Sequence, residues 1–442
     1  MHDLSDFATR ITREPHYIET WFTNAAGSII DDTVSSGGFI RELRNKPQIQ
    51  GLTQNPLLLS LICSLYQEKN LTIPARRSQI YEKAVNYMLG EWRARHSRQQ
   101  PEEGWIIAKT ELLEELAYHL SCEGKEIFSL RELRDKIEEY LRGERGTDFR
   151  DIRALDLIKE LSEEDGIIQK LSREGDKYLF LHRTFQEYLT ASYLNQVLQK
   201  DQSEGITLTK THFWEYDWHE TLSLLTGLMD DPIPLLQAIG DEKDDIFSSM
   251  LLLAGRCIAE CEADSQPLIA EMINSIYTLW HSYPSLGFIK STVVALGQAN
   301  SQMSECLQKA LNHEDSYVRW QAAAALGEIG GPEAVEALIQ ALNHEDSYVR
   351  WQAAAALGEI GGPEAVEALI QALNHEDSYV RRRAAAALGE IGSLEILEKL
   401  IQLPEIDIYD TNIFSLARKL AVRYSKERVP FLPVYPERVG RA

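Results

Sequence analysis

Three histidine–glutamate pairs recur at positions 31 residues apart and are the most obvious candidates for chemistry in this chain. They are His313–Glu314, His344–Glu345 and His375–Glu376. Imidazole and carboxylate groups together can bind transition metals such as iron. Each pair stands in a polar turn between two helical patterns, so successive pairs would stack along one edge instead of converging on one ion. We therefore expect a solvated polar turn and no metal site.

The five cysteines give no second metal or redox site. They are Cys63, Cys122, Cys257, Cys261 and Cys306, too few for a disulfide framework in a chain of 442 residues. Cys257 and Cys261 are four residues apart, a helical spacing that a ligand or redox pair could use. No second pair or nearby histidine completes such a site, so we expect two small side chains packed in a core.

Nucleotide hydrolysis requires a phosphate-binding loop of the form GxxxxGK[ST]. The only Gly–Lys pair in the sequence is Gly124–Lys125, and Glu126 follows it. We therefore predict that this chain is not an enzyme and holds no cofactor by itself.

The charge of the chain limits its partners. The formal net charge is −23, whereas non-specific affinity for nucleic acid comes mainly from Lys and Arg. The N-terminus lacks the apolar segment of a signal peptide, and the longest apolar run, Asn55–Tyr66, is too short to span a membrane. We expect a cytoplasmic protein with no membrane partner, and a nucleic-acid partner is not favoured.

An internal repeat is the strongest signal for fold. Leu311–Ala341 and Leu342–Ala372 have identical sequences, and a third copy begins at Leu373 and diverges after Gly392. A fixed period of this length is typical of stacked supersecondary units. The sequence therefore predicts an α-solenoid in an all-α protein.

Each unit is predicted to contain two helices. Pro332 favours a helix start, and apolar residues then recur with helical spacing up to Leu342. Asp346 or Ser347 would cap the second helix and Gly361 would end it. Asp346 also lies four residues before Arg350, where the two could form an ion pair within the helix.

The pattern Asp-x-x-Val-Arg-x-x-Ala-Ala-x-Ala-Leu-Gly resembles the short HEAT-like repeat of bilin lyases and many bacterial regulators. Aromatic residues and one arginine recur at solenoid spacing within it, and they are candidate contacts for a protein partner. These residues are Tyr317, Trp320, Tyr348, Trp351 and Arg382. The tryptophans could equally pack against the adjacent repeat, and both interpretations stay open.

The N-terminal half contains three ordered motifs. NPLLL stands at Asn55–Leu59, Arg77-x-x-x-Tyr81 follows, and F-x-H-R-T-F-Q-E-Y-L occupies Phe180–Leu189. Two strand-like runs, Gly166–Lys170 and Lys177–His182, precede a helix in the outline of a winged-helix domain. The acidic residues around its wing disfavour insertion into a DNA groove.

This set resembles the helical and winged-helix domains of NACHT-family signal-transduction ATPases. The resemblance implies that Pro56 packs near an adenine and that His182 contacts the β-phosphate of ADP, provided that a P-loop core is joined to the chain. A structural role for both residues is the alternative. The P-loop core itself would then be a possible partner, and residues 1–35 look like the end of such a core.

The predicted organisation has six parts. These are a remnant of the NTPase core at 1–35, a helical domain at 36–76, a winged-helix domain at 77–200, a helical connector of degenerate repeats at 201–300, HEAT-like repeats at 301–402, and a capping helix with a tail at 403–442. The function favoured by the sequence is the non-catalytic sensor or regulatory portion of a NACHT-type ATPase. The alternatives are a stand-alone HEAT scaffold and, ranked last, a chaperone or enzyme of the bilin-lyase kind.

Overall fold

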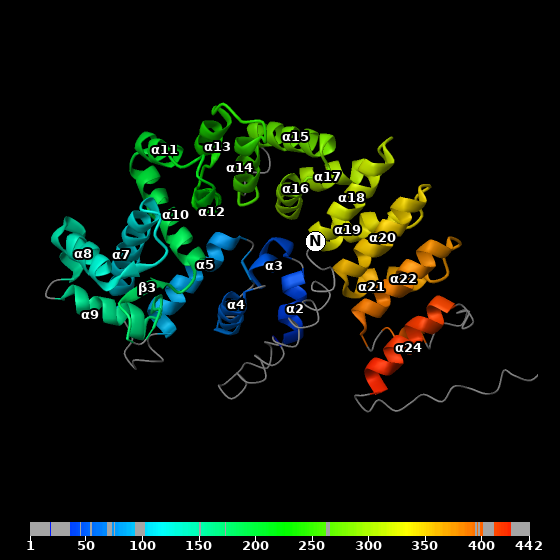
Figure 1. The fold of residues 1–442 in the computed structure, drawn as a ribbon, viewed down its shortest axis with the longest axis horizontal. Helices are drawn as coiled ribbons and strands as arrows, with labels where there is room; N and C mark the ends of the chain where they lie inside the picture. The colour runs from blue at the N-terminus through cyan, green and yellow to red at the C-terminus, as the bar shows by residue number, and fades with distance from the viewer. Residues whose placement is uncertain are drawn as a thin grey trace, which may run out of the picture. The chain divides into compact units, whose positions relative to one another are not determined.

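The chain forms two compact units that are built almost entirely from helices (Figure 1). A computed structural model describes residues 18, 36–44, 46–53, 55–68, 73–74, 76–92, 102–149, 152–172, 174–261, 266–393, 396, 398–400 and 411–425. One unit lies within Tyr17–Met303, and the other includes the residues from Ser304 onward. The predicted all-α fold with an α-solenoid is confirmed. Most of the predicted core remnant at 1–35 and the predicted tail lie outside the described residues.

Three helices lie at the start of the continuously described part of the first unit. They are α2 (Ser36–Arg44), α3 (Pro47–Thr53) and α4 (Pro56–Glu68). Proline is well suited to the first position of a helix, where its missing N–H group costs no hydrogen bond. Leu58, Leu59 and Ile62 of α4 are buried, so the apolar run of the sequence is the core of this helical part.

The winged-helix part follows. Its helical elements are α5 (Arg77–Tyr87), the π-helix η1 (Met88–Trp92), α7 (Glu103–Cys122), α8 (Leu130–Arg142), the 3-10 helix η2 (Glu144–Phe149), α9 (Ala154–Lys159), the π-helix η3 (Glu160–Glu164) and α10 (Arg183–Lys200). Its strands are β1 (Phe128–Ser129), β2 (Ile168–Lys170) and β3 (Lys177–Phe180). The helix expected after the two strand-like runs begins at Arg183.

The three strands form one antiparallel sheet in the order β1-β3-β2. Phe128 pairs with Tyr178, and Ile168 pairs with Phe180. The predicted hairpin of β2 and β3 is therefore present. The third strand, β1, was not predicted because two residues carry no alternating pattern that a sequence could reveal.

A buried ion pair fixes the wing to the helices. The Nζ atom of Lys109 lies 2.6 Å from Asp165 Oδ2 and 2.6 Å from Glu160 Oε1, and the side chains of Lys109 and Asp165 are fully buried. Trp105 donates to the same Glu160 oxygen at 2.8 Å. Loss of one partner from such a cluster leaves an uncompensated charge in the core, which is strongly destabilising.

A run of helices connects this part to the repeats. These elements are α11 (Gln202–Lys210), the 3-10 helix η4 (Tyr216–Trp218), α12 (His219–Leu228), α13 (Ile233–Gly240), α14 (Ser249–Ile258), α15 (Pro267–Ser282), α16 (Gly287–Ala299) and α17 (Ser301–Ala310). Phe213, Trp218 and Trp280 are buried, whereas Trp214 and Tyr216 are exposed.

The repeats form the second unit. Their helices are α18 (Ser316–Ile329), α19 (Gly331–Ala341), α20 (Ser347–Ile360), α21 (Gly362–Ala372) and α22 (Ser378–Ile391), and α24 (Thr411–Ser425) follows. The alanine-rich helices α18, α20 and α22 pack in succession, and α24 packs on α22 (Figure 1). Asp346 is the N-cap of α20, accepting from the Tyr348 amide at 2.8 Å. Gly361 ends that helix with a φ of 63°, a conformation that favours glycine.

The expected ion pair between Asp346 and Arg350 within one helix is wrong. Asp346 instead accepts from Arg319 of the preceding repeat, and Arg350 binds Asp377 of the following repeat. The Arg350 guanidinium also donates to the carbonyl oxygens of His344 and Glu345 at 2.7 and 2.9 Å. Because Asp346 caps its own helix, its second oxygen faces the neighbouring repeat, and each pair joins two units.

Among the described residues, no helix is both long and apolar enough to span a membrane.

Candidate functional site

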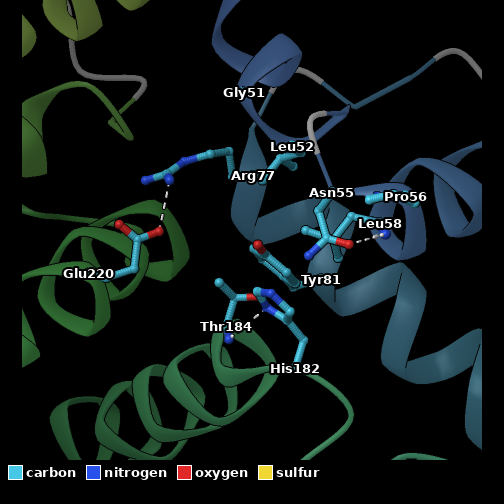
Figure 2. A pocket seen from close by; sticks show the side chains of 10 residues that line it. All are labelled: Gly51, Leu52, Asn55, Pro56, Leu58, Arg77, Tyr81, His182, Thr184 and Glu220. Atoms are coloured by element: carbon cyan, nitrogen blue, oxygen red, sulfur yellow. Dashed lines mark hydrogen bonds and ion pairs between the residues drawn. The ribbon is translucent and has the colours of Figure 1, made fainter. Parts of the chain in front are cut away.

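Pro56 and His182, which are far apart in the sequence, line one pocket of about 430 Å³ in the first unit (Figure 2). Pro56 is the exposed first residue of α4, and His182 directly precedes α10. The full lining consists of Gly51, Leu52, Asn55, Pro56, Leu58, Arg77, Tyr81, His182, Thr184 and Glu220. The fold therefore brings together the two residues that the sequence singled out for nucleotide contact.

His182 is held in one orientation by the first turn of α10. Its Nδ1 atom accepts a hydrogen bond from the Thr184 amide at 3.3 Å and lies 2.8 Å from the Thr184 hydroxyl. In a neutral imidazole, an accepting Nδ1 leaves the proton on Nε2. Burial lowers the pKa of His182, which keeps the ring neutral. The ring thus has one N–H group to donate.

Arg77 brings a positive charge to the same pocket. It is the first residue of α5, and its guanidinium donates to Glu220 Oε1 at 2.7 Å and to Glu260. The first carboxylate belongs to α12 and the second follows α14, so Arg77 links the winged-helix part to the connector. Tyr81, one turn further along α5, is fully buried and packs against Phe185 with ring centroids 5.8 Å apart.

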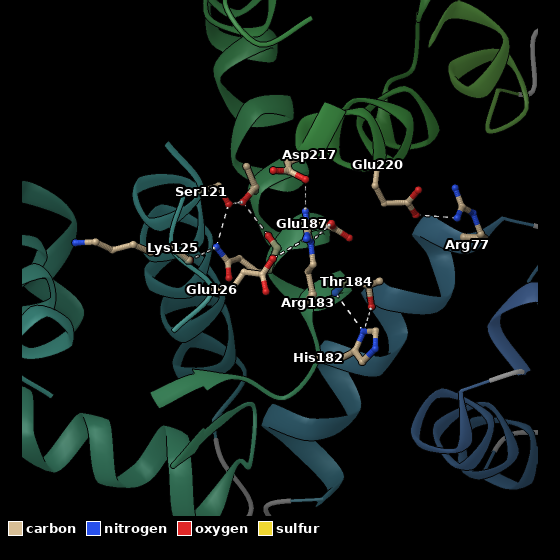
Figure 3. Close-up of polar contacts among 12 residues, drawn as sticks. Arg77, Ser121, Lys125, Glu126, His182, Arg183, Thr184, Glu187, Asp217 and Glu220 are labelled. Carbon is tan, nitrogen blue, oxygen red and sulfur yellow. Dashed lines mark hydrogen bonds and ion pairs between the residues drawn. The ribbon is translucent and has the colours of Figure 1, made fainter. Parts of the chain in front are cut away.

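A polar network behind the pocket fixes the start of α10 (Figure 3). Arg183 binds Glu126, Glu187 and Asp217 at 2.6, 2.8 and 3.3 Å. Gln186 donates to the Ser121 hydroxyl and to the Lys125 carbonyl oxygen. Residues within the winged-helix part and one residue of the connector after it thereby position His182 indirectly.

The candidate contact residues of the repeats differ in exposure. Tyr317 and Tyr348 are 46% and 70% exposed, and Arg382 is also exposed. Trp320 and Trp351 are half-buried. The tyrosines and Arg382 are therefore accessible to a partner. Each tryptophan side chain has one part at the surface and another part packed against neighbouring residues.

Contacts between repeats account for the tryptophans. Trp320 Nε1 donates to Gln352 Oε1 of the next repeat at 2.9 Å. The Arg383 guanidinium lies 5.0 Å from the Trp351 ring centroid, a cation–π contact with the next repeat. These contacts favour the packing interpretation for both tryptophans.

The histidines of the His–Glu pairs form hydrogen bonds within the turns in which they lie. The Nδ1 atoms of His313, His344 and His375 accept from the amides of Asp315, Asp346 and Asp377 at 2.9–3.0 Å. Within the described part of the chain, no three His, Cys, Asp or Glu side chains gather as metal ligands. The imidazoles order the turn that precedes each alanine-rich helix.

Comparison with known families matches two parts of the chain. A winged helix-turn-helix domain C-terminal to NACHT matches residues 77–194, and HEAT repeats match 290–344 and 335–411. The chain combines a NACHT-associated winged-helix domain with HEAT repeats. The HEAT match begins within α16, before the predicted start at 301. No curated protein matches the chain.

Comparison with solved structures finds weak similarity to several proteins. An engineered protein is 17% identical, with coverage of 83% of this chain and 98% of that one and a TM-score of 0.26. Human deoxyhypusine hydroxylase in complex with glycerol is 19% identical, with coverage of 54% and 85% and a TM-score of 0.24. Kap121p is 12% identical, with coverage of 96% and 51% and a TM-score of 0.30. Similarity at this level does not extend to activity or partners.

Sequence reasoning missed two residues, Glu220 and Tyr379. Glu220 of the connector lines the pocket of the winged-helix unit, and no motif marked it. In the HEAT repeats, Tyr379 is the third-copy counterpart of Tyr317 and Tyr348 and is 59% exposed. Alignment of the three copies would have identified Tyr379, whereas Glu220 could be found only in three dimensions.

Proposed function

We propose that this chain is the non-catalytic regulatory portion of a NACHT-type signal-transduction ATPase that acts in the cytoplasm. In this proposal the winged-helix unit contacts a bound ADP or ATP, and the HEAT repeats bind a protein partner. The observation that carries it is the meeting of Pro56 and His182 in one pocket beside the Arg77 guanidinium. Both residues occupy the positions that the NACHT resemblance assigns to nucleotide contact.

The chemistry of the pocket supports an anionic ligand. A neutral His182 has one N–H donor, and Arg77 adds a permanent positive charge. Neither residue replaces the glycine-rich loop and Mg²⁺ ligands that hydrolysis needs. Those would come from a P-loop core outside these residues, and the purified chain should not hydrolyse ATP.

Titration of the full chain with ADP tests this proposal. The ring signals of His182, followed by NMR, should move at millimolar ADP, because this portion supplies only part of a nucleotide site. The His182→Ala variant should bind more weakly, and the control His281→Ala, at a half-buried histidine that does not line the pocket, should bind as the wild type does. Unchanged His182 signals, or measurable ATP hydrolysis by the chain alone, would contradict the proposal.

The exposed tyrosines of the repeats support a protein partner and also favour the second candidate, a stand-alone HEAT scaffold. Tyr317, Tyr348 and Tyr379 take equivalent places in the first turns of α18, α20 and α22. Aromatic side chains dominate the energy of many protein interfaces. A scaffold with the three tyrosines intact would bind its partner equally well with the pocket empty or occupied.

Partner capture by variants separates the two candidates. Replacement of all three tyrosines by alanine should abolish capture under either candidate, whereas Glu333→Ala with Glu364→Ala, on exposed positions of α19 and α21, should not. Under the regulatory candidate, ADP should also change the affinity for the captured protein. If the chain binds ADP but its affinity for the captured protein does not change, the result favours the scaffold.

A further inference from the structure

Four helix N-termini surround the pocket of Figure 2. Pro56 begins α4, Arg77 begins α5, and Thr184 and Glu220 lie in the first turns of α10 and α12. The N-terminal end of a helix carries a partial positive charge, and its free N–H groups favour anions such as phosphate. Of the ten residues that line the pocket, only Glu220 carries a negative charge.

A second, independent feature points to a missing ligand. The Tyr81 side chain is fully buried, and its hydroxyl lies beside Thr184 without a well-formed hydrogen bond to any described residue. A buried hydroxyl without a partner costs free energy, so such groups commonly await a ligand or a water molecule. Burial raises the pKa of Tyr81 to about 12, so the hydroxyl keeps the proton that it can donate.

Arg77 is shared unequally between its two carboxylates. Glu260 is 6% exposed, so its carboxylate depends on the guanidinium for compensation. Glu220 is 32% exposed and binds through the other arm of Arg77 at 2.7 Å. The pair with Glu220 is the weaker of the two because water screens it, and it can be exchanged while Glu260 holds the guanidinium in place.

We propose that Glu220 is a built-in anion that a phosphate group of the ligand displaces from Arg77. Release of Glu220 frees the first turn of α12, so occupancy of the pocket is relayed to the helical connector. This inference rests on the proposed nucleotide contact and adds Arg77, Tyr81 and Glu220 to it. Through this exchange, ligand binding at the winged-helix part would change the helices of the connector that follow it.

Two further contacts allow α12 to respond to the release of Glu220 at one end only. Arg76 Nη1 and the Ser78 hydroxyl both donate to the Gly227 carbonyl oxygen near the end of α12, at 2.9 and 3.2 Å. The C-terminal end of α12 thus stays anchored to α5 when its N-terminal end is released. Displacement of Glu220 would loosen one end of the helix without detaching the connector.

Calorimetric titration of inorganic pyrophosphate into the full chain tests the exchange. Glu220→Gln removes the competing charge and should tighten pyrophosphate binding about fivefold, the factor that corresponds to about 1 kcal/mol. The control Glu242→Gln changes a carboxylate of the connector that binds Lys210, away from the pocket, and should leave the affinity unchanged. The double variant Arg77→Gln with Glu260→Gln avoids a lone buried carboxylate and should lose binding.

Hydrogen exchange tests the relay. Pyrophosphate should speed amide exchange in the first turn of α12 in the wild type and leave α7 unchanged, whereas in Glu220→Gln the same turn should already exchange fast. Pyrophosphate binding with equal affinities for wild type and Glu220→Gln, or with no change at α12, overturns the relay and leaves the nucleotide contact standing. No binding of either pyrophosphate or ADP overturns both proposals.

Discussion

Buried carboxyl groups should set the pH response of the winged-helix unit. Glu114 is 4% exposed and accepts from the Ser192 hydroxyl and from Gln196 Nε2, both at 2.5 Å. Burial raises the pKa of Glu114 to about 7 from the usual value of 4.5. The folded state therefore holds this proton more tightly than the unfolded state does. The resulting stabilisation is complete below pH 4.5 and is lost as the pH rises through 7.

Glu114→Gln should reduce this dependence, and Glu187, whose pKa burial also raises to about 7, should retain part of it. The wild type should lose on the order of 1–3 kcal/mol of unfolding free energy between about pH 5 and about pH 8, and the variant should lose less. Urea unfolding followed by circular dichroism at both pH values measures the difference. The exposed control Glu139→Gln should behave as the wild type does. Equal pH dependence in wild type and Glu114→Gln would mean that the carboxyl titrates normally.

The repeat aromatics should separate into packing and contact residues. Trp320→Ala removes a half-buried ring and its bond to Gln352, so it should cost about 2 kcal/mol, less than a fully buried tryptophan would. Tyr348→Ala, at a side chain that is 70% exposed, should change stability by less than about 0.5 kcal/mol while it weakens partner capture. Thermal melting gives both values. A larger loss for Tyr348 than for Trp320 would reverse the assignment.

At the scale of elements, glycine lets neighbouring alanine-rich helices approach closely. A Cβ atom added at Gly358 would lie 2.5 Å from the Ala387 Cβ atom, too close to be accommodated without a shift. The equivalent residue of the third copy, Gly389, faces α24, where an added Cβ would lie 3.4 Å from the Lys419 side chain. The same sequence position thus has no room for a Cβ atom in one copy and allows an ordinary van der Waals contact in the next.

These two glycines make a matched test of helix packing. Gly358→Ala should destabilise the repeats by about 1–3 kcal/mol, because α20 and α22 must move apart. Gly389→Ala should be neutral or stabilising by up to about 1 kcal/mol, since alanine favours the helix. Thermal unfolding of the full chain measures both. Similar effects at both positions would show that α20 and α22 are less closely packed than the distances indicate.

The ion pairs between repeats add an acid-sensitive link. The hydrogen bond from Arg350 lowers the pKa of Asp377 below its usual value of 3.8. A lowered folded-state pKa stabilises the protein above the unfolded value, and that contribution is lost as the pH falls below 3.8. The repeats should therefore weaken in acid, whereas Glu114 acts in the opposite direction near neutral pH.

At the scale of the whole molecule, each repeat contacts its neighbours through the same set of side chains. Arg319 binds Asp346 and Arg350 binds Asp377, so the two interfaces between the three copies use the same ion pair. Solenoids built in this way behave as nearly additive stacks of identical units. The stack of repeats should accordingly remain folded after one whole copy is removed.

Deletion of residues 342–372 should keep the fold. The deletion would place Asp377 where Asp346 stands, so that Arg319 regains a partner in the shortened stack. Circular dichroism should show an unchanged helical fraction, and unfolding should remain cooperative at a lower melting temperature. Deletion of 342–365, which breaks the period within α21, is the control and should lose helicity. Loss of helicity in both would show that the copies are not interchangeable.

The sequence alone determined the repeat, the helical fold, the hairpin and the two residues of the pocket. These follow from local rules, because a 31-residue identity and helical spacing act within a single unit, and the motifs around Pro56 and His182 are contiguous. Tertiary structure alone decided the rest. Arg350 pairs with Asp377 and not with Asp346, because Asp346 caps its own helix and its second oxygen faces Arg319. Glu220 lines the pocket because α12 packs beside α5. Such pairings depend on which helices are neighbours in space, and no local pattern encodes them.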